Sequence, residues 1–377
     1  MKYDMLGLIF AENPEAKLGE LTSVRALAAV PAGGRYRIID FMLSNMVNSA
    51  VTNVGLTTPY NYQSLTDHLG TGKDWDLDRK EDGLFILPPK ETGESSAEML
   101  GGVDVINGVM HYLTKSKMEY AVVVDCNTIC NIKFNDAYKF HMEQGADITL
   151  IYTKSSKLDA KEVKRNIFLD IDEESKVITD LHVYPTKQKT DNVYMHMFII
   201  RKELLMDLVE DAVAHGKHQI SKDIFLPAMQ NFKLCGYEFC GYKKKIDNIQ
   251  SYFDFNMDLL QKDVRDELFG ITSNNPIYTK IKDTVPAKYG KNAEVSGSFV
   301  ADGCIIEGTV RNSILFRGVH VGKGAVVENC ILMQNAEVLD NCLTENVIFD
   351  KEVVLRSGKK LVGQATYPMV IGKGTVI

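Results

Sequence analysis

The loop after the first predicted strand lies where an α/β protein commonly holds a phosphate. The strand-like run covers residues 5–11 and is followed by Glu12, Asn13, Pro14 and Glu15. Phosphate-binding loops at this position need glycines, because backbone N–H groups must approach the anion. This loop has no glycine before Gly19, contains two carboxylates, and includes a proline that lacks an N–H group. It therefore combines the position of a phosphate site with residues that repel phosphate.

The composition is that of an ordinary globular protein. The chain has 377 residues, of which 45% are hydrophobic and 25% charged, and its net charge is −7. This length suggests two domains. The acidic balance does not favour binding to nucleic acid or to an anionic membrane, and the sequence shows neither a signal-peptide pattern nor an apolar run of membrane-spanning length. We therefore expect a cytoplasmic protein, whose seven scattered cysteines are reduced and bind no zinc.

The first part of the chain, residues 1–270, alternates short apolar runs with amphipathic stretches. Runs such as YAVVVDC and DITLIYT predict strands, and stretches such as residues 98–116 and 247–268 predict helices. This alternation is typical of a Rossmann-like α/β domain with a mostly parallel sheet covered on both faces. Residues 271–292 contain prolines and no clear period, so we interpret them as a linker.

A six-residue period replaces the helical signals in residues 293–377. One row of apolar residues contains Leu315, Val321, Val327, Met333 and Leu339, and a second contains Ile314, Val326, Leu332 and Val338. This period predicts a parallel β-helix of four or five coils, in which each row stacks down one flat face. A β-sandwich is the alternative fold. His320 interrupts the second row, and we expect a structural role for it rather than the acyl transfer that some hexapeptide β-helix enzymes perform.

Several motifs resemble the glucose-1-phosphate adenylyltransferase family over nearly the whole chain. The elements GGRYRIIDF, LSN, QSL and WDLDR lie at the family's spacing, DNIQSYFDFNMDLL resembles the helix after its second metal site, and GCIIEGTVRNSILFRGVHVGKGAVVENCILM resembles its C-terminal β-helix. These enzymes make ADP-glucose and diphosphate from ATP and glucose 1-phosphate, using Mg²⁺. The resemblance implies a nucleotidyltransferase (GT-A-like) domain, a left-handed β-helix of hexapeptide repeats, and a tetramer acting in glycogen biosynthesis.

The positions that bind phosphate and metal in this family are changed here. The family's glycine-rich loop aligns with residues 10–18, where all three glycines are lost and only Lys17 keeps a positive charge. The phosphate lysine is replaced by Leu27. The two metal-binding aspartates are replaced by Asn127 and Lys245. Since neither an amide nor a lysine replaces a carboxylate as a Mg²⁺ ligand, the resemblance predicts no bound cofactor and no catalytic residues.

The sugar site of the family is changed as well. Its sugar-phosphate lysine corresponds to Tyr184, and its glycine beside the sugar lies within the bulkier segment YMHMF at 194–198. Lys222 is retained. Asp125 lies two residues before Asn127, and alternation along a strand would place its side chain on the same face.

These changes together indicate a chain that does not perform the family's reaction. Each lost electrostatic contact typically costs about 10²–10³ in rate. The chain resembles the non-catalytic branch of the family, the glycogen biosynthesis protein D type, whose members occur beside a catalytic subunit. We therefore predict a regulatory subunit that forms a homo- or hetero-oligomer with a catalytic adenylyltransferase subunit. Two other functions remain open: a weakly active enzyme whose altered metal site uses Asp125, and a self-standing homo-oligomer that binds a sugar phosphate or effector.

The resemblance also implies an effector site. In the family, the segment corresponding to AGGRYR lies near that site and faces the β-helix. Arg35 and Arg37, with Arg356, are therefore candidates for binding an anionic small molecule, and structural ion pairs are the alternative. The other retained positions are Lys17, Lys222, Trp75, Asp76, Asp78 and Arg79. We expect Trp75 to pack at a domain or subunit contact.

Overall fold

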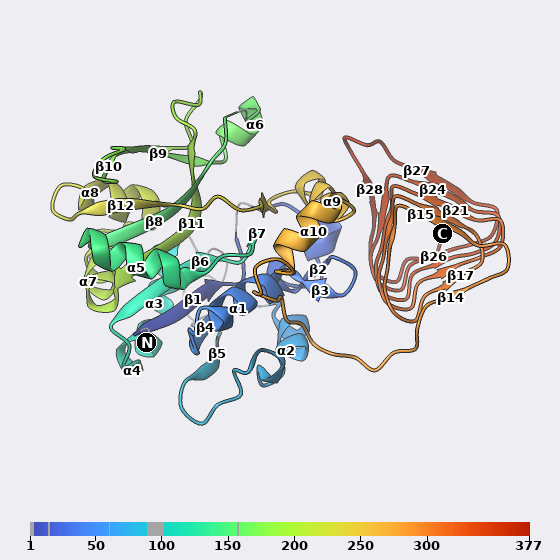
Figure 1. Ribbon diagram of the computed structural model, residues 1–377, viewed down its shortest axis with the longest axis horizontal. Helices are drawn as coiled ribbons and strands as arrows, with labels where there is room; N and C mark the ends of the chain where they lie inside the picture. The colour runs from blue at the N-terminus through green and yellow to red at the C-terminus, as the bar shows by residue number, and fades with distance from the viewer. Residues whose placement is uncertain (1–3, 14–15, 60, 89–101, 157) are drawn as a thin grey trace.

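The computed structural model describes residues 4–13, 16–59, 61–88, 102–156 and 158–377. A sheet flanked by helices forms the N-terminal part, and stacked triangular coils form the C-terminal part (Figure 1). The final helix of the first part ends at Leu268, and the first strand of the coils begins at Lys288. None of the described helices is long and apolar enough to cross a membrane.

The N-terminal part is built on a nine-stranded sheet in the described residues. Its strands are β1 (Met5–Phe10), β4 (Asn53–Thr57), β5 (Gly83–Leu87), β6 (Tyr120–Asp125), β8 (Ile148–Lys154), β9 (Ile167–Ile171), β10 (Ile178–Val183), β11 (Asn192–Arg201) and β12 (Leu234–Glu238). The central β1 is parallel to β4 and β6, whereas β11 is antiparallel to β6, β8 and β9. The sheet is therefore mixed, because β11 returns against the parallel strands.

Helices cover both faces of this sheet, which explains why β1 is apolar throughout. Met5 and Ile9 pack into one core cluster, and Leu6 and Leu8 pack into the other. The longer helices are α1 (Ile38–Asn48), α2 (Gln63–Leu69), α3 (Gly102–Gly108), α5 (Phe134–Gln144), α7 (Lys202–Ala214), α9 (Ile249–Asp258) and α10 (Lys262–Leu268). The single helix predicted over 247–268 is thus two helices, with a break after Asp258.

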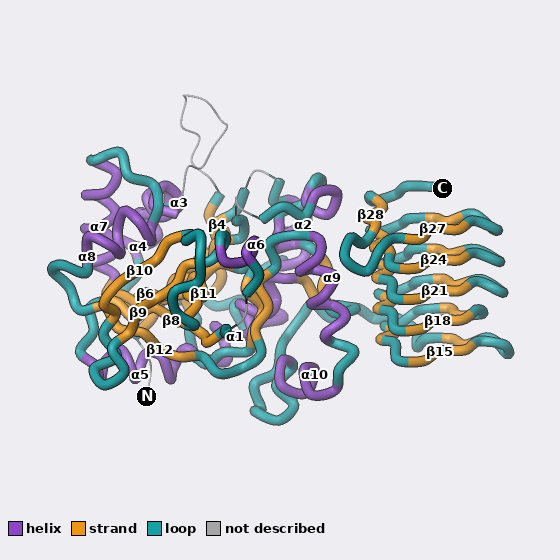
Figure 2. Tube along the Cα trace, turned by 90° about the horizontal axis from the view of Figure 1, so that it is seen from above, coloured by secondary structure: helices purple, strands orange, loops and turns teal. Residues whose placement is uncertain are grey.

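The C-terminal part is a left-handed β-helix, as predicted, whose coils stack in register (Figure 2). Three parallel five-stranded sheets form its walls. One contains β14 (Lys288–Tyr289), β17 (Ile305–Ile306), β20 (His320–Val321), β23 (Glu337–Val338) and β26 (Val354–Leu355). The second contains β15 (Glu294–Ser296), β18 (Thr309–Arg311), β21 (Val326–Glu328), β24 (Leu343–Glu345) and β27 (Lys360–Val362). The third contains β16 (Phe299–Val300), β19 (Ile314–Leu315), β22 (Ile331–Leu332), β25 (Val347–Phe349) and β28 (Met369–Ile371).

The expectation that each six-residue row stacks down one face is wrong. Leu315, Val321 and Val327 lie in three different sheets, so steps of six run around a coil. Stacking follows the pairing of Leu315 with Leu332, and this step falls one residue short of three full hexads. In the next coil, the residue that points into the interior is therefore one position earlier than a count of three hexads predicts. Met333 accordingly leaves the interior and packs against the N-terminal part.

The third sheet joins the β-helix to the N-terminal part, because it is apolar on both faces. Leu315, Leu332 and Phe349, which stack in successive coils, fill the β-helix interior. Ile314, Ile331 and Ile348 belong instead to the core cluster of the N-terminal part, and all three are fully buried. The two parts therefore share one hydrophobic core.

A buried ion pair lies at this junction. Both carboxylate oxygens of Asp350 lie 3.0 Å from one guanidinium nitrogen of Arg25, although only Oδ1 has hydrogen-bond geometry. The side chains are 2% and 0% exposed. Asp350 Oδ1 also accepts the N–H of Lys351 at 2.7 Å. Neither charge can return to water without separating the two parts of the chain.

Removing one partner of this pair should destabilise the protein strongly. Arg25→Ala leaves a buried carboxylate without its cation, which typically costs about 3–5 kcal/mol. The double variant Arg25→Met/Asp350→Leu should recover most of this loss, because neither charge remains. Urea unfolding followed by circular dichroism measures both.

The exposed pair Arg311–Glu294 supplies the matched control. Its side chains are 50% and 73% exposed at 3.8 Å, so Arg311→Ala should cost at most about 1 kcal/mol. An Arg25→Ala variant no less stable than Arg311→Ala would contradict the assigned role.

Candidate functional site

The region at the carboxyl ends of β1 and β6, here called the cleft after the family's active site, contains a series of polar contacts that begins with Glu12. Its Oε2 accepts the backbone N–H of Leu27 at 3.1 Å. Burial raises the pKa of this carboxyl group, and the N–H of Leu27 partly offsets that effect. A backbone N–H group beside the first strand is thus already hydrogen-bonded to a carboxylate of the chain. Leu27 itself is fully buried in the short turn η2 (Leu27–Ala29).

A chain of polar contacts continues from there across the cleft. Asn13 Nδ2 donates to Asp125 Oδ2 at 3.2 Å, and the same oxygen lies 3.7 Å from His196 Nδ1. On the other side of the imidazole, Lys245 Nζ lies 3.4 Å from His196 Nε2. Lys245 Nζ also donates to the carbonyl of Arg165 at 3.2 Å.

The charge of this chain of contacts is set by burial. Burial first, and then the cations Lys245 and Lys243, hold the pKa of His196 well below its usual value, so the ring is neutral. Both lysines come from β13 (Lys243–Lys245), which pairs with β7 (Thr128–Cys130). Burial first, and then Lys245, lowers the pKa of Lys243 to about 8. The imidazole therefore contacts Asp125 and Lys245 without adding a third charge.

His196 reaches this position through a distorted backbone. It lies in β11 where the pairing with β8 is interrupted, and its φ is +55°. Such a φ is uncommon for residues other than glycine. The bulge directs the imidazole between Asp125 and Lys245.

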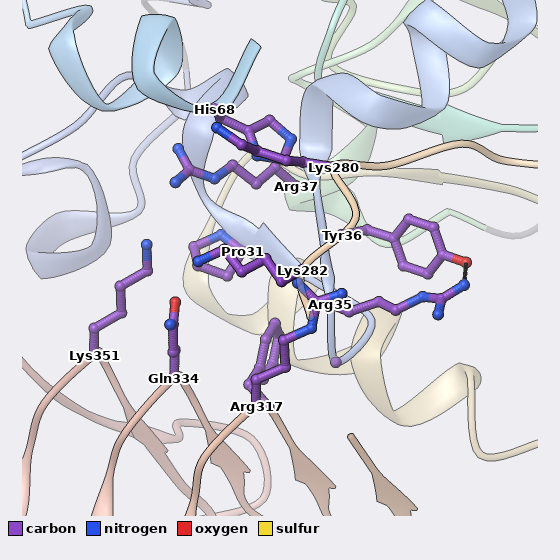
Figure 3. A pocket seen from close by; sticks show the side chains of 12 residues that line it. Pro31, Arg35, Tyr36, Arg37, His68, Lys280, Lys282, Arg317, Gln334 and Lys351 are labelled. Carbon is purple, nitrogen blue, oxygen red and sulfur yellow. Dashed lines mark hydrogen bonds between the residues drawn. The ribbon is translucent and has the colours of Figure 1, made fainter. Parts of the chain in front are cut away.

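A cavity lies between the two parts of the chain (Figure 3). It measures about 450 Å³, its open mouth included. The residues lining it are Pro31, Gly34, Arg35, Tyr36, Arg37, His68, Lys280, Lys282, Phe316, Arg317, Gln334 and Lys351. Six of these carry cationic side chains, and within the described chain no carboxylate lines the cavity. Its chemistry is therefore that of an anion site.

The β-helix wall of this cavity is one column of side chains. Arg317, Gln334 and Lys351 occupy equivalent places in three successive coils, and they rise side by side from neighbouring turns (Figure 3). The opposite wall comes from the segment around β3 (Tyr36–Arg37) and from α2. The linker lies along the N-terminal part, where Tyr278 N donates to Ser44 Oγ at 2.8 Å. It thereby brings Lys280 and Lys282 to the cavity mouth.

Comparison with known proteins gives the family of this chain. Residues 15–262 match the family described as nucleotidyl transferase, and residues 282–366 match the family described as GlmU-like, C-terminal hexapeptide. The chain is 37% identical over 372 residues to the glycogen biosynthesis protein GlgD of Bacillus subtilis, which covers 99% of this chain and 96% of that protein. It is 38% identical over 376 residues to GlgD of Geobacillus stearothermophilus, with coverages of 100% and 98%.

One of the similar proteins is named as an enzyme. The glucose-1-phosphate adenylyltransferase of Clostridium perfringens strain SM101 is 33% identical over 347 residues, which are 89% of this chain and 86% of that enzyme. The chain belongs to the glucose-1-phosphate adenylyltransferase family. Its resemblance to GlgD proteins extends over the full length.

The motif resemblance predicts Lys245 and Asn127 at the two metal-binding positions of the family and His196 at the glycine beside the sugar. Asn127 is fully buried and donates to Ile246 O at 3.4 Å. Its Oδ1 has no hydrogen-bond partner among the described residues.

The possible ligands for a metal ion lie elsewhere in the described chain. Asp170, Asp180 and His182 are the one described group with three ligand atoms within 4.8 Å of one another, and they lie on β9 and β10. His182 already contacts Asp170 at 2.8 Å, and Lys189 Nζ lies 3.5 Å from the same ring. Asp125 belongs to no such group in the described residues.

The predicted effector residues separate in the structure. Arg35 and Arg37 both line the cavity. The Arg35 guanidinium extends to the Tyr36 hydroxyl at 3.3 Å (Figure 3). Arg37 donates to Ser64 O at 2.6 Å. Burial is the main cause that lowers the pKa of Arg37 to about 10. Arg356 is exposed after β26 and is not among the lining residues.

The retained family positions are dispersed. Trp75 is buried within the N-terminal part, with its ring 5.7 Å from His68, which lines the cavity. Lys17 and Lys222 are exposed. The remaining three make local contacts: Asp76 pairs with Arg79, and Asp78 accepts from Thr71 Oγ1 at 2.9 Å. Glu15 lies outside the described residues, and His320 lies 3.7 Å from Glu307 on the β-helix surface.

Four cavity residues were not found by sequence reasoning: Lys280, Lys282, Arg317 and Lys351. Two of them come from a linker without periodicity. The other two share a column with Gln334, and the true coil length would have aligned them. The signal was therefore present for the β-helix wall and absent for the linker.

Restoring both metal aspartates should not restore the family's reaction. In Asn127→Asp/Lys245→Asp, Mg²⁺ affinity should rise because two carboxylates replace an amide and a cation. ADP-glucose formation should stay at background, because Glu12 still occupies the N–H of Leu27. Calorimetric titration with Mg²⁺ and a turnover assay measure the two quantities.

The control is Asn127→Asp/Lys262→Asp, which makes the same charge change on the exposed surface of α10. It should not gain Mg²⁺ affinity comparable to that of the first variant. Near-normal turnover by Asn127→Asp/Lys245→Asp would show that the Glu12 loop is not a decisive loss.

Proposed function

We propose that this chain is a catalytically inactive regulatory subunit of glucose-1-phosphate adenylyltransferase in glycogen biosynthesis. The observation that carries the proposal is the ammonium of Lys245 in the place of a metal ligand, within 3.4 Å of His196. Glu12 supports it from the other side of the cleft, because its carboxylate holds the N–H of Leu27. A cleft whose own charges stand at the phosphate and metal positions cannot hold Mg²⁺-ATP productively.

Regulation requires a site for an effector, and the inter-domain cavity supplies its chemistry. We place an anionic small molecule there, held by the cations of both walls. Arg35 faces it from the N-terminal part, and Arg317 and Lys351 face it from the β-helix. A ligand in this place touches both domains, so it can favour one arrangement of the subunit over another.

The partner is a catalytic adenylyltransferase subunit, in a mixed oligomer. The ends of the β-helix support this assembly, since they expose apolar side chains that a neighbour would cover. Tyr289 and Val295 in the first coil are 53% and 37% exposed, and Val362 and Tyr367 in the last are 52% and 81% exposed. Deleting the β-helix is not a clean test, because Ile314, Ile331 and Ile348 belong to the core of the N-terminal part.

The purified chain alone should make no ADP-glucose above background. Mixed with a catalytic subunit such as the adenylyltransferase of an organism that also has a GlgD protein, it should associate and change that subunit's activity. The measurement compares this chain alone, the catalytic subunit alone and the pair, with size-exclusion chromatography of the pair.

Each alternative has its own outcome in this experiment. Clear Mg²⁺-dependent turnover by the chain alone would favour the weakly active enzyme that uses Asp125. Failure of the pair to associate at micromolar concentration, or an unchanged rate of the catalytic subunit, would favour the self-standing effector-binding homo-oligomer.

The effector response should depend on Arg35. Its guanidinium contacts only the side chain of Tyr36 among the described residues, so Arg35→Ala removes a cavity charge with little structural cost. Saturation curves of the mixed enzyme should shift by about 5–150-fold in effector concentration, with a smaller change in maximal rate.

Arg356→Ala is the matched control, because it removes the same charge from the β-helix away from the cavity. Its curve should overlay that of the wild type. Equal shifts in both variants would indicate a general charge effect and not a site.

A further inference from the structure

Lys351 has an unusual place in the cavity. It lies half-buried in the turn after β25, next to Asp350. The Asp350 carboxylate points away to Arg25 and accepts the backbone N–H of Lys351, at 3.0 and 2.7 Å. The ammonium of Lys351 therefore lines a cavity without a carboxylate of its own.

Several cations surround Lys351. Arg37 of β3, Arg25 behind the turn and Lys282 of the linker act on its charge. Arg35, Lys280 and Arg317 line the same cavity. His68 of α2 and the neutral Gln334 complete the lining. The nearest acids serve other partners: Asp350 pairs with Arg25, Asp40 with His68 at 2.6 Å, and Asp302 with Arg317 at 3.9 Å.

This surrounding disfavours a positive charge on Lys351. Burial is the largest cause, followed by Arg37 and Arg25, and together they lower its pKa to about 7. The arginines stay charged throughout the neutral range. Burial and then the cations Arg317, Arg37 and Lys280 lower the pKa of Lys282 as well, and Lys351 is the cavity lysine whose pKa burial and repulsion lower to about 7.

We propose that the cavity takes up a proton together with its anion, and that Lys351 is the group that binds this proton. The inference rests on the proposed effector site. A dianion placed between Lys351, Arg37 and Arg317 favours the ammonium over the neutral amine, so the amine gains one proton from solvent as the anion enters. No bond to carbon is made or broken.

The sign of the pH dependence follows. Below pH 7 Lys351 is already an ammonium, so the anion binds without proton uptake and with full affinity. Above pH 7 the free amine is neutral, and each bound anion must bring about one proton with it. The apparent affinity should therefore fall about tenfold for each pH unit above 7, until the pKa of the complex is reached.

Sulfate is the probe, because it does not itself titrate between pH 6 and pH 9. The full-length chain is titrated with sulfate by calorimetry at constant ionic strength, in two buffers of different ionisation enthalpy at each pH. The difference between the buffers gives the number of protons taken up. We expect a value near zero at pH 6 and near one at pH 8.

Three variants assign the proton. Lys351→Arg keeps the charge at all pH values, so it should bind sulfate at pH 9 about as tightly as at pH 6, without proton uptake. Lys351→Gln should bind sulfate weakly at both pH values. Near pH 9 the affinity of the wild type should approach that of Lys351→Gln. Lys359→Arg, on the exposed last coil, is the control and should keep the pH dependence of the wild type.

The outcomes separate this inference from the function on which it rests. Two results would overturn the role of Lys351 and leave the effector site standing. One is a heat of sulfate binding at pH 8 that is the same in both buffers, and the other is a pH dependence of affinity that persists in Lys351→Arg. Absence of binding at pH 6 by both sulfate and diphosphate would overturn the effector site itself.

Discussion

The buried pair of Arg25 and Asp350 fixes the position of the β-helix on the sheet domain, and the cavity depends on that position. Hydrophobic contact through Ile314, Ile331 and Ile348 brings the two parts together, but apolar contact alone tolerates sliding by one coil. A single carboxylate opposite a single guanidinium does not. The next residue, Lys351, then necessarily faces Arg37 and the linker lysines. The residue that docks the β-helix and a residue that lines the cavity thereby belong to the same turn.

The polar groups at the carboxyl ends of β1 and β6 in the nucleotidyltransferase domain make contacts with groups of the same chain. The carboxylate of Glu12 accepts the N–H of Leu27, and the ammonium of Lys245 lies 3.4 Å from His196 Nε2, so groups of both charges lie in this region. His196 lies between Asp125 and Lys245 and stays neutral. Because each buried polar group needs a partner whether or not a ligand is present, these internal contacts contribute to the stability of the fold.

The sequence was sufficient for the fold class and the family, and insufficient for most of the charged residues of the cavity. Alternating periods predicted the α/β domain, and the hexad period with its motifs predicted the β-helix. Arg35 and Arg37 were found because they lie in a recognisable motif. Lys280 and Lys282 were not, since a linker has no period that fixes where its side chains point. The column of Arg317 and Lys351 was missed because three full hexads are one residue longer than the real coil, so a hexad count drifts from column to column.

The coil length also determines how insertions and deletions affect the β-helix. A gain or loss of one residue within a coil turns the following row from the interior to the surface, whereas a gain or loss of a whole coil leaves every later side chain on its face. Phe316, Met333 and Asp350 occupy equivalent places in three successive coils. Removing one coil would preserve the β-helix and yet present Asp350 one strand spacing, about 4.8 Å, from its present place. Arg25 therefore fixes the number of coils as well as their position.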